Sequence, residues 1–329
     1  MTDVFFTATK RALNNITSNY DMVWPTAVGL WNLRCMVNGV KKEFPEITEA
    51  ELAAKFSQGS GIHGVNYQRA FIQTTWTQQQ TKFAWILLNS TIPIFEGWLE
   101  ELKQNYFTDM DVKALQFPTQ AQAEVARLTA NSSTMLHNSF YSTYLGKRDR
   151  CYAQLDALLH CYRVFKEARN CYMHNGSIAD QKLINAYTDY LPFATASSLC
   201  VSEVPDFPAP ALGTEVQVSL RGVVGFSYIL IKLLVSLDTE LLCAADAEAE
   251  FIARYQQKHK IMRTLKPNAD ESRRQVKQYV QQWFPIVAAA QLEKNNELEK
   301  EGFIIIAGKI PKRYFEKRWY GYNAKEATL

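Results

Sequence analysis

Apolar residues recur every three to four positions along most of this chain. The spacing is found at 26–44, 70–104, 148–173, 220–245 and 272–291. One face of an α-helix repeats with that period, so each segment is predicted to be a helix with one apolar side. The alternating pattern of a strand occurs only in EVQVSL at 215–220 and FIIIAGKI at 303–310. The sequence therefore predicts a mainly α fold.

Two stretches interrupt this helical pattern and mark the expected boundaries. One is the glycine-containing loop SQGSGIHGVN at 57–66, and the other is the charged stretch around 246–250. We expect an N-terminal helical region over 1–66, a helical domain over 67–246, and a basic C-terminal region over 247–329. That last region is predicted to be mostly helical with one short strand.

Composition indicates a soluble, folded protein. A chain of 329 residues with 47% hydrophobic residues can bury a large core. The N-terminus lacks the pattern of a secretory signal, and the apolar segment VVGFSYILIKLLVSL is interrupted by Lys232 and is too short to span a bilayer. The six cysteines form no C-x-x-C pair. We therefore expect a cytoplasmic protein without membrane contact, with reduced and mostly buried thiols and with no metal or cofactor.

Charge is unevenly distributed along the chain. The formal net charge is +3, yet residues 251–329 carry 16 Lys and Arg against 8 Asp and Glu. Such asymmetry is typical of contact with nucleic acid, and a solvated helix face would give the same pattern. Both interpretations stay open at this point.

The segment 148–173 carries the most informative chemistry. Its apolar positions form one stripe that must face a core or a partner: Tyr152, Leu155, Leu158, Leu159, Tyr162, Phe165 and Ala168. The next position of the stripe is Arg169. Because a guanidinium is costly to desolvate without an anion, Arg169 is expected to have a specific partner or to line a polar cleft.

Two further polar residues follow within one helical turn. Asn170 and His174 are four positions apart and so share one face, and Gly176 is placed to end the helix in a left-handed cap. His174 then lies in the last turn, where the helix dipole favours its protonated form. In this composition, an Arg-Asn pair at this distance before a His has a chance expectation of roughly 0.01.

The stretch RNCYMH at 169–174 resembles the R-x4-6-H motif of the HEPN superfamily, in the form that has a polar residue after the Arg. The likeness covers about 148–245 well and 75–147 by helical pattern alone. It implies a helical bundle and a metal-independent endoribonuclease of bacterial defence or toxin–antitoxin type, which dimerises so that two motifs face each other. It also implies that Arg169 and His174 are catalytic and that Asn170 orients one of them.

These residue types suit RNA cleavage. The reaction needs a base for the 2′-hydroxyl, a cation for the charged transition state and an acid for the leaving 5′-oxygen. One motif supplies too few groups, so we expect a homodimer, formed through the 152–168 stripe, that yields a 2′,3′-cyclic phosphate. The alternative is that Arg169 pairs with Glu167 or Asp180 while His174 only caps the helix.

The basic C-terminus is a second candidate site. Five cations alternate there with aromatic residues, as expected of a surface that binds single-stranded RNA: Lys309, Lys312, Arg313, Lys317 and Arg318. Rings packed inward beside solvated lysines would give the same pattern.

The function expected from all of these features is that of an anti-phage defence effector or toxin. Its partners would be RNA, a second copy, and an antitoxin or defence-system protein. A non-catalytic HEPN-like interaction or nucleic-acid-binding module is the alternative function. His160 is expected to be structural or at the surface. Trp76, Trp85 and Trp98 are expected to anchor a core or a dimer interface.

Overall fold

The computed structural model describes residues 4–133 and 136–247, and within these ranges the chain is mainly helical without a β-strand. The α-helices are α1 (Thr7–Asp21), α2 (Val23–Glu43), α3 (Glu49–Ser57), α4 (Trp76–Asn105), α5 (Pro118–Leu128), α7 (Ser142–Leu145), α8 (Leu155–His174), α9 (Gln181–Tyr190) and α10 (Leu220–Leu241). The predicted mainly α class is therefore confirmed for the described residues. The helices predicted at 26–44, 70–104, 148–173 and 220–245 correspond to α2, α4, α8 and α10.

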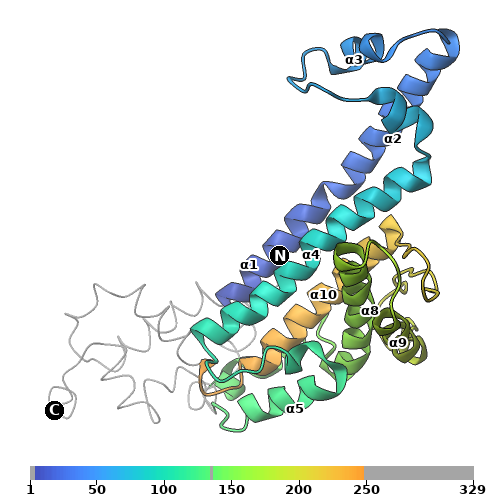
Figure 1. The fold of residues 1–329 in the computed structure, drawn as a ribbon. Coiled ribbons are helices and arrows are strands. Elements are labelled where there is room, and N and C mark those ends of the chain that lie inside the picture. Colours follow the sequence, from blue (N-terminus) through green and yellow to red (C-terminus); the bar gives the residue numbers. More distant parts are fainter. Residues whose placement is uncertain (1–3, 134–135, 248–329) are drawn as a thin grey trace, which may run out of the picture.

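The larger part of the molecule is a helical bundle. Helix α8 packs against α5, α9 and α10, and α1 packs against α4 and α10 (Figure 1). The largest fully buried side chains are Trp98, Tyr162, Phe5, Phe6, Phe95, Phe107, Phe140, Phe165 and Phe226. Each aromatic ring removes roughly 150–250 Å² from water, so these rings dominate the stability of the bundle.

The apolar stripe of α8 faces the core of its own chain. Tyr162 is fully buried with its ring edge against Phe95, at 5.0 Å between ring centroids, and Phe165 stacks on Phe226 at 4.3 Å. The stripe is therefore not available as a surface for a second copy. The expectation that dimerisation uses the 152–168 stripe is wrong, because α4 and α10 already cover it.

Helix α10 runs through the bundle. It is long and apolar enough to cross a membrane by length and composition, yet most of it is buried inside the described part of the chain, which is compatible with a soluble protein. Its one basic interior residue, Lys232, is buried and donates to Asp149 at 3.0 Å. That ion pair explains how an apolar helix accommodates a lysine.

The start of α10 depends on a close approach by a loop. Ser219 caps the helix by accepting the N–H of Gly222 at 2.9 Å. A Cβ atom on Gly222 would lie 1.9 Å from the carbonyl oxygen of Asp206, so only glycine fits at this position. The proline-containing segment before α10 is thereby held against the bundle.

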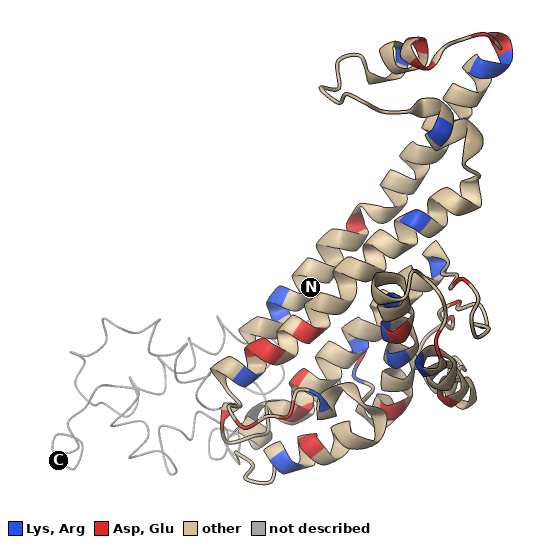
Figure 2. Cartoon of the chain, in the orientation of Figure 1, with Lys and Arg blue, Asp and Glu red and all other residues tan. Residues whose placement is uncertain are grey.

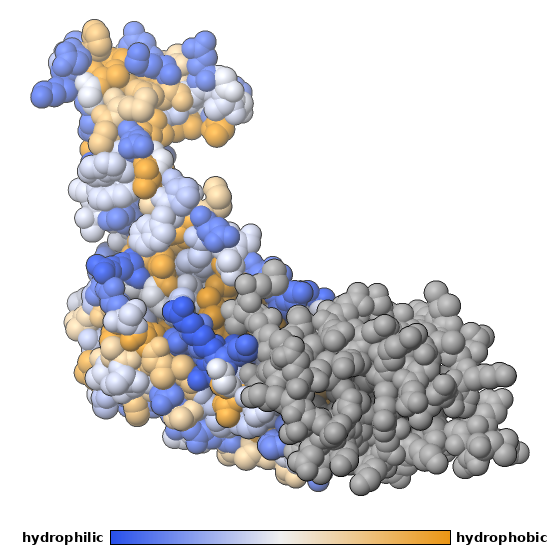
Figure 3. Space-filling view, turned by 180° about the vertical axis from the view of Figure 1, so that it is seen from behind, coloured by the Kyte–Doolittle hydropathy of each residue, from blue (hydrophilic) through white to orange (hydrophobic). Residues whose placement is uncertain are grey.

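An arm extends from the bundle. Helix α2 continues the direction of α1 and runs beside the first half of α4, with α3 at the far end (Figure 1). A small second core lies at this tip and consists of Val37, Leu52, Tyr67 and Phe71. The arm between bundle and tip carries few charged residues (Figure 2), and seen from behind it stands clear of the bundle, with hydrophobic residues at the surface of its tip (Figure 3).

Capping boxes fix where the arm helices begin. Thr48 accepts the N–H of Glu51 at 3.3 Å and the Glu51 carboxylate accepts the N–H of Thr48 at 2.8 Å, so that α3 starts at Glu49. Thr75 and Gln78 form the same arrangement at the start of α4. Residues close together in the sequence therefore determine where α3 and α4 begin.

Helix α1 belongs to the bundle although it lies within the predicted N-terminal region. Phe5 and Phe6 are fully buried in the main core, and α1 packs on α4 and α10. Residues on both sides of the predicted boundary at 66 thus share one core. The predicted C-terminal region, including the helix at 272–291 and the strand at 303–310, lies outside the described residues from 248 onward.

The strand predicted at 215–220 is wrong. Glu215 forms a single isolated bridge with Ile178, and Leu220 is already the first residue of α10. The backbone N–H of Val216 donates to Ser177 at 2.8 Å, and that of Ala179 donates to Thr214, also at 2.8 Å. Because α9 begins at Gln181 and α10 at Leu220, the pairing cannot lengthen into a ladder.

Candidate active site

The 169–174 motif occupies the last turns of α8, which ends as the sequence predicts. The N–H groups of Asn175 and Ser177 both donate to the carbonyl of Cys171, at 2.9 and 3.0 Å. Gly176 has a φ of +59°, which confirms the predicted left-handed cap. His174 is therefore the final residue of the helix and is exposed.

The end of α8 is anchored on two sides. The Tyr172 ring stacks on Trp85 of α4, with 4.3 Å between centroids and 17° between planes. After the helix, the backbone pairing of residues 177–179 with 213–216 holds the connection to α9. The motif is thus presented by a fixed helix end rather than by a free loop.

Arg169 has fewer partners than any other half-buried arginine in the described part of the chain. Its only hydrogen bond runs from Nη1 to Oδ1 of Asn170 at 3.4 Å, and its Nε is buried without a hydrogen-bond partner. The other half-buried arginines, Arg34, Arg150 and Arg163, donate to carbonyl, hydroxyl or carboxylate oxygens. A buried donor without an acceptor costs about 1–3 kcal/mol.

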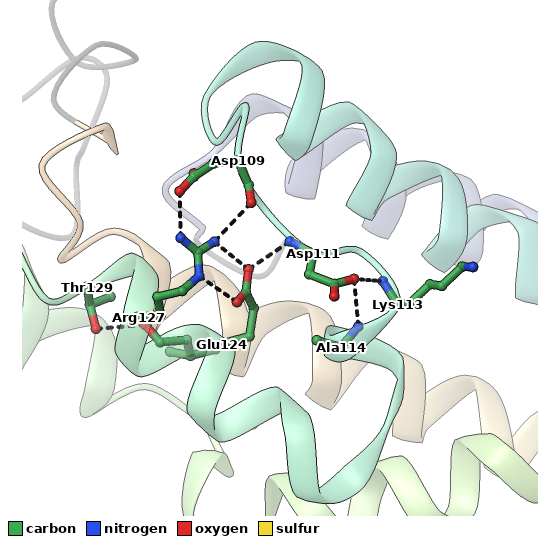
Figure 4. Close-up of polar contacts among 8 residues, drawn as sticks. Asp109, Asp111, Lys113, Ala114, Glu124, Arg127 and Thr129 are labelled. Atoms are coloured by element: carbon green, nitrogen blue, oxygen red, sulfur yellow. Dashed lines mark hydrogen bonds and ion pairs between the residues drawn. The ribbon is translucent and has the colours of Figure 1, made fainter.

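Arg127 shows what a structural arginine looks like in this protein (Figure 4). Its Nε and Nη2 donate to Glu124 at 2.8 and 2.7 Å, and its Nη1 donates to Asp109 at 2.5 Å. Glu124 also accepts the N–H of Asp111, and the Arg127 hydrogen bonds lower the pKa of Glu124. Arg127 fastens α5 to the preceding loop, and Arg169 has no comparable carboxylate.

Both carboxylates that could have paired with Arg169 are occupied elsewhere. Glu167 is buried, forms an ion pair with Arg163 and accepts a hydrogen bond from Nδ2 of Asn170 at 3.1 Å. Asp180 caps α9 by accepting the N–H of Leu183 and also accepts from Asn175. In the structure Arg169 therefore pairs with neither Glu167 nor Asp180, which were the alternative partners.

Asn170 links the arginine to this polar group. Its amide oxygen accepts from Arg169 while its amide nitrogen donates to Glu167. Arg163, Glu167, Asn170 and His174 follow one another at intervals of four, three and four residues, so they form one polar line along α8. The sequence alone suggested Glu167 only as a partner of Arg169 and did not single out Arg163, although the i,i+4 spacing of these two residues could have indicated their ion pair.

Arg169 and His174 do not meet within one chain. Five positions separate them, which places their side chains about 140° apart around the helix axis. Among the described residues, neither makes a hydrogen bond or ion pair with the other, and His174 has no such partner at all. One copy therefore presents the arginine and the histidine on different sides of the same helix end.

The remaining candidate residues have other environments. His160 is half-buried and stacks on Phe193 at 4.6 Å, and burial lowers its pKa, so it is structural as expected. Trp85 and Trp98 are buried in the main core. In the described ranges, no three His, Cys, Asp or Glu side chains are grouped so that they could hold a metal ion.

The predicted RNA-binding residues Lys309, Lys312, Arg313, Lys317 and Arg318 lie outside the described residues. Comparisons with protein-family models, with curated proteins and with solved structures give no match for this chain. The candidate site therefore rests on its residues and their geometry.

Proposed function

We propose that this protein is a metal-independent endoribonuclease of HEPN type that acts as an anti-phage defence effector or toxin. The observation that carries the proposal is the state of Arg169. Its guanidinium lies half-buried at a fixed helix end, with Nε unpaired and with no carboxylate of its own. A phosphate would supply the missing acceptors, since guanidinium binds phosphate through two parallel donors.

His174 would supply the proton transfer. It is the last residue of α8 and is exposed, so a substrate can reach its imidazole. An imidazole can take the 2′-hydroxyl proton as a base or protonate the leaving 5′-oxygen as an acid. Attack by the 2′-oxygen on phosphorus then expels the 5′-oxygen, giving a 2′,3′-cyclic phosphate and a 5′-hydroxyl.

Two copies would complete this site. The reaction needs a base and an acid on opposite sides of the scissile phosphate, and one copy offers a single histidine on a different side of α8 from its arginine. Two motifs facing each other across a two-fold axis would provide two arginines and two histidines. Because the 152–168 stripe is buried, the contact must use other surfaces.

The rest of the proposal concerns binding and location. Lys309, Lys312, Arg313, Lys317 and Arg318 would neutralise phosphates of the RNA while neighbouring rings stack on its bases. The protein would act in the cytoplasm, where an antitoxin or another defence-system protein would control it. No cofactor takes part in this chemistry.

One observation favours the alternative of a non-catalytic HEPN-like interaction or nucleic-acid-binding module. Arg169 and His174 do not contact each other within a copy, so a protein that never brings two motifs together would bind RNA or a partner protein without cleaving RNA.

An RNA-cleavage assay in EDTA distinguishes the two functions. We expect cleavage by the full chain and its loss in both Arg169→Ala and His174→Ala. His63→Ala, in an exposed loop at the tip of the arm, is the matched control and should cleave normally. Unchanged cleavage in both motif variants would refute the assignment, provided that circular dichroism shows them to be folded.

A further inference from the structure

Helix α2 carries an apolar stripe that stays largely exposed in the described part of the chain. Its residues are Trp24, Val28, Trp31, Cys35 and Met36. Trp24 is 50% exposed, Val28 58%, Trp31 46% and Met36 57%, and Cys35 is also exposed. The positions 24, 28, 31 and 35 follow the four-three-four spacing of a helix face that packs against another helix, and Met36 lies about 100° further around, at the edge of that face. We call these five residues the α2 stripe.

The other side of α2 packs against the rest of the chain. Val23, Ala27 and Val37 are buried, and Trp31 also touches Trp76 of α4 edge-on at 5.2 Å. The α2 stripe is therefore additional to the apolar surface that holds the arm together. From its exposed fractions it offers roughly 500 Å² of surface, taking about 150–250 Å² for each large ring. The largest apolar patch on a typical monomer covers about 300–600 Å² and is often functional, so a patch of this size is a candidate interaction site.

Charge restricts what can cover the stripe. No Asp, Glu, Lys or Arg occurs from Met22 to Leu33, and this part of α2 is uncoloured by charge in Figure 2. A charged partner would have its ions desolvated without counterions. The C-terminal segment of this chain carries 16 Lys and Arg between 251 and 329, but it also contains uncharged apolar runs such as FIIIAG at 303–308. Covering of the stripe by this segment is therefore an outcome that the experiment below must distinguish. The occupant must itself be apolar and uncharged.

The α2 stripe meets that requirement, and we propose that it binds the α2 stripe of a second copy. A two-fold contact brings the same surface together from both copies and opposes no like charges. Two stripes would bury about 1,000 Å² in total, which reaches the minimum for a specific interface.

This contact goes beyond the proposed nuclease function because it depends on α2 alone. It lies outside the range of the HEPN resemblance and would form equally in a non-catalytic protein. The stripe variants separate the two proposals: loss of the dimer in Trp24→Glu with cleavage retained would show that the nuclease pairs through another surface, and a wild-type dimer without cleavage would leave the α2 contact standing.

The test measures the mass of the full chain by sedimentation equilibrium over a hundredfold range of concentration. The wild-type chain should reach the mass of two copies. Trp24→Glu and Val28→Glu each bury two carboxylates, one from each copy, in an apolar contact without counterions, which costs several kcal/mol. We expect their dimer dissociation constants to rise at least about a hundredfold.

Leu212→Glu is the matched control, because Leu212 is 62% exposed in the loop before α10 and lies outside the stripe. It should dimerise like the wild type. A single-copy mass for the wild type at every concentration would overturn the proposal, as would unchanged dimerisation of both stripe variants.

Hydrogen exchange on the wild-type chain gives a readout that requires no variant to fold. Amides of residues 22–36 should exchange more slowly at high than at low protein concentration. Exchange that does not depend on protein concentration would overturn the proposal, because the hydrogen bonds of α2 alone would then account for the protection.

Discussion

The carboxylate of Asp238, near the end of α10, accepts the backbone N–H of Phe5 at 2.7 Å and thereby joins the two ends of the described chain. It also accepts the N–H of Phe6 at 3.0 Å, and all three residues are fully buried. Thr9 hydrogen bonds to the same carboxylate and accepts the indole N–H of Trp98 at 2.9 Å. One carboxylate thus connects α10, the residues before α1 and, through Thr9, α4.

This carboxylate should make stability depend on pH. Burial raises the pKa of Asp238 to about 6, whereas an unfolded aspartate titrates near 3.9. Between these values the folded state holds a proton that the unfolded state has lost. The contribution of Asp238 to stability is therefore fully present below about pH 4 and is lost as pH rises to about 6, on the order of 3 kcal/mol in all. Urea unfolding measured across this range checks the decline.

Asp238→Asn is the variant that isolates the effect. The amide cannot ionise, so the difference in unfolding free energy between wild type and variant should narrow as pH rises from 4 to 6. Glu240 and Asp156 also have raised pKa values from burial, but their contribution is common to both proteins and cancels. A difference that stays constant over this range would show that Asp238 does not titrate there.

Charged substitutions in the α8 stripe should unfold the bundle. Tyr162 and Phe165 are at most 1% exposed, so glutamate at either position would bury an unpaired charge and remove ring contacts. We expect a loss of more than about 4 kcal/mol. Circular dichroism during thermal unfolding measures it. An unchanged melting temperature for Tyr162→Glu would contradict the burial of Tyr162 in the core.

Periodicity and capping signals predicted the elements around the site. The apolar stripe of 152–168 predicted the buried face of α8, and Gly176 predicted its end. These succeed because helix period and left-handed caps depend on residues close together in sequence. The strand predicted at 215–220 failed because alternation of apolar residues is a local signal, whereas a strand forms only beside a second strand. Residues 177–179 offer this segment a single isolated bridge.

Long-range relationships could not be predicted in this way. Nothing near Asp238 in the sequence indicates that it accepts the N–H of Phe5. The pattern of α2 predicts an apolar face but cannot tell whether the same chain covers it, and Trp24 remains exposed. Similarly, the position of Arg169 indicated a need for an anion, and only the structure shows that Glu167 is already taken by Arg163.

The cysteines should differ widely in reactivity. Burial raises the pKa of Cys161 and Cys243 to about 12 and that of Cys151 to about 11, so little thiolate forms at pH 8. Cys35 is exposed on α2 and should be alkylated first. Mass spectrometry of peptides after timed iodoacetamide treatment, at a protein concentration low enough to keep the chain monomeric, gives the order.

Denatured protein is the control for this measurement and should lose the difference between sites. Equal alkylation rates for Cys35 and Cys161 in folded protein would contradict the burial of Cys161. At high protein concentration Cys35 should react more slowly, because it lies in the α2 stripe.

Substitutions of Asn170 test whether it orients Arg169 for catalysis. Asn170→Ala removes the acceptor that holds the guanidinium but leaves its charge, so cleavage should fall by about tenfold, less than in Arg169→Ala. Asn170→Asp supplies a carboxylate that pairs with Arg169 and competes with the phosphate, so cleavage should fall further. Rates and KM in single-turnover assays, together with melting temperatures, measure both effects. If Asn170 had only a structural role, the loss of activity in each variant would be proportional to its loss of melting temperature. If Asn170→Asp cleaved faster than Asn170→Ala, Arg169 would not bind the scissile phosphate.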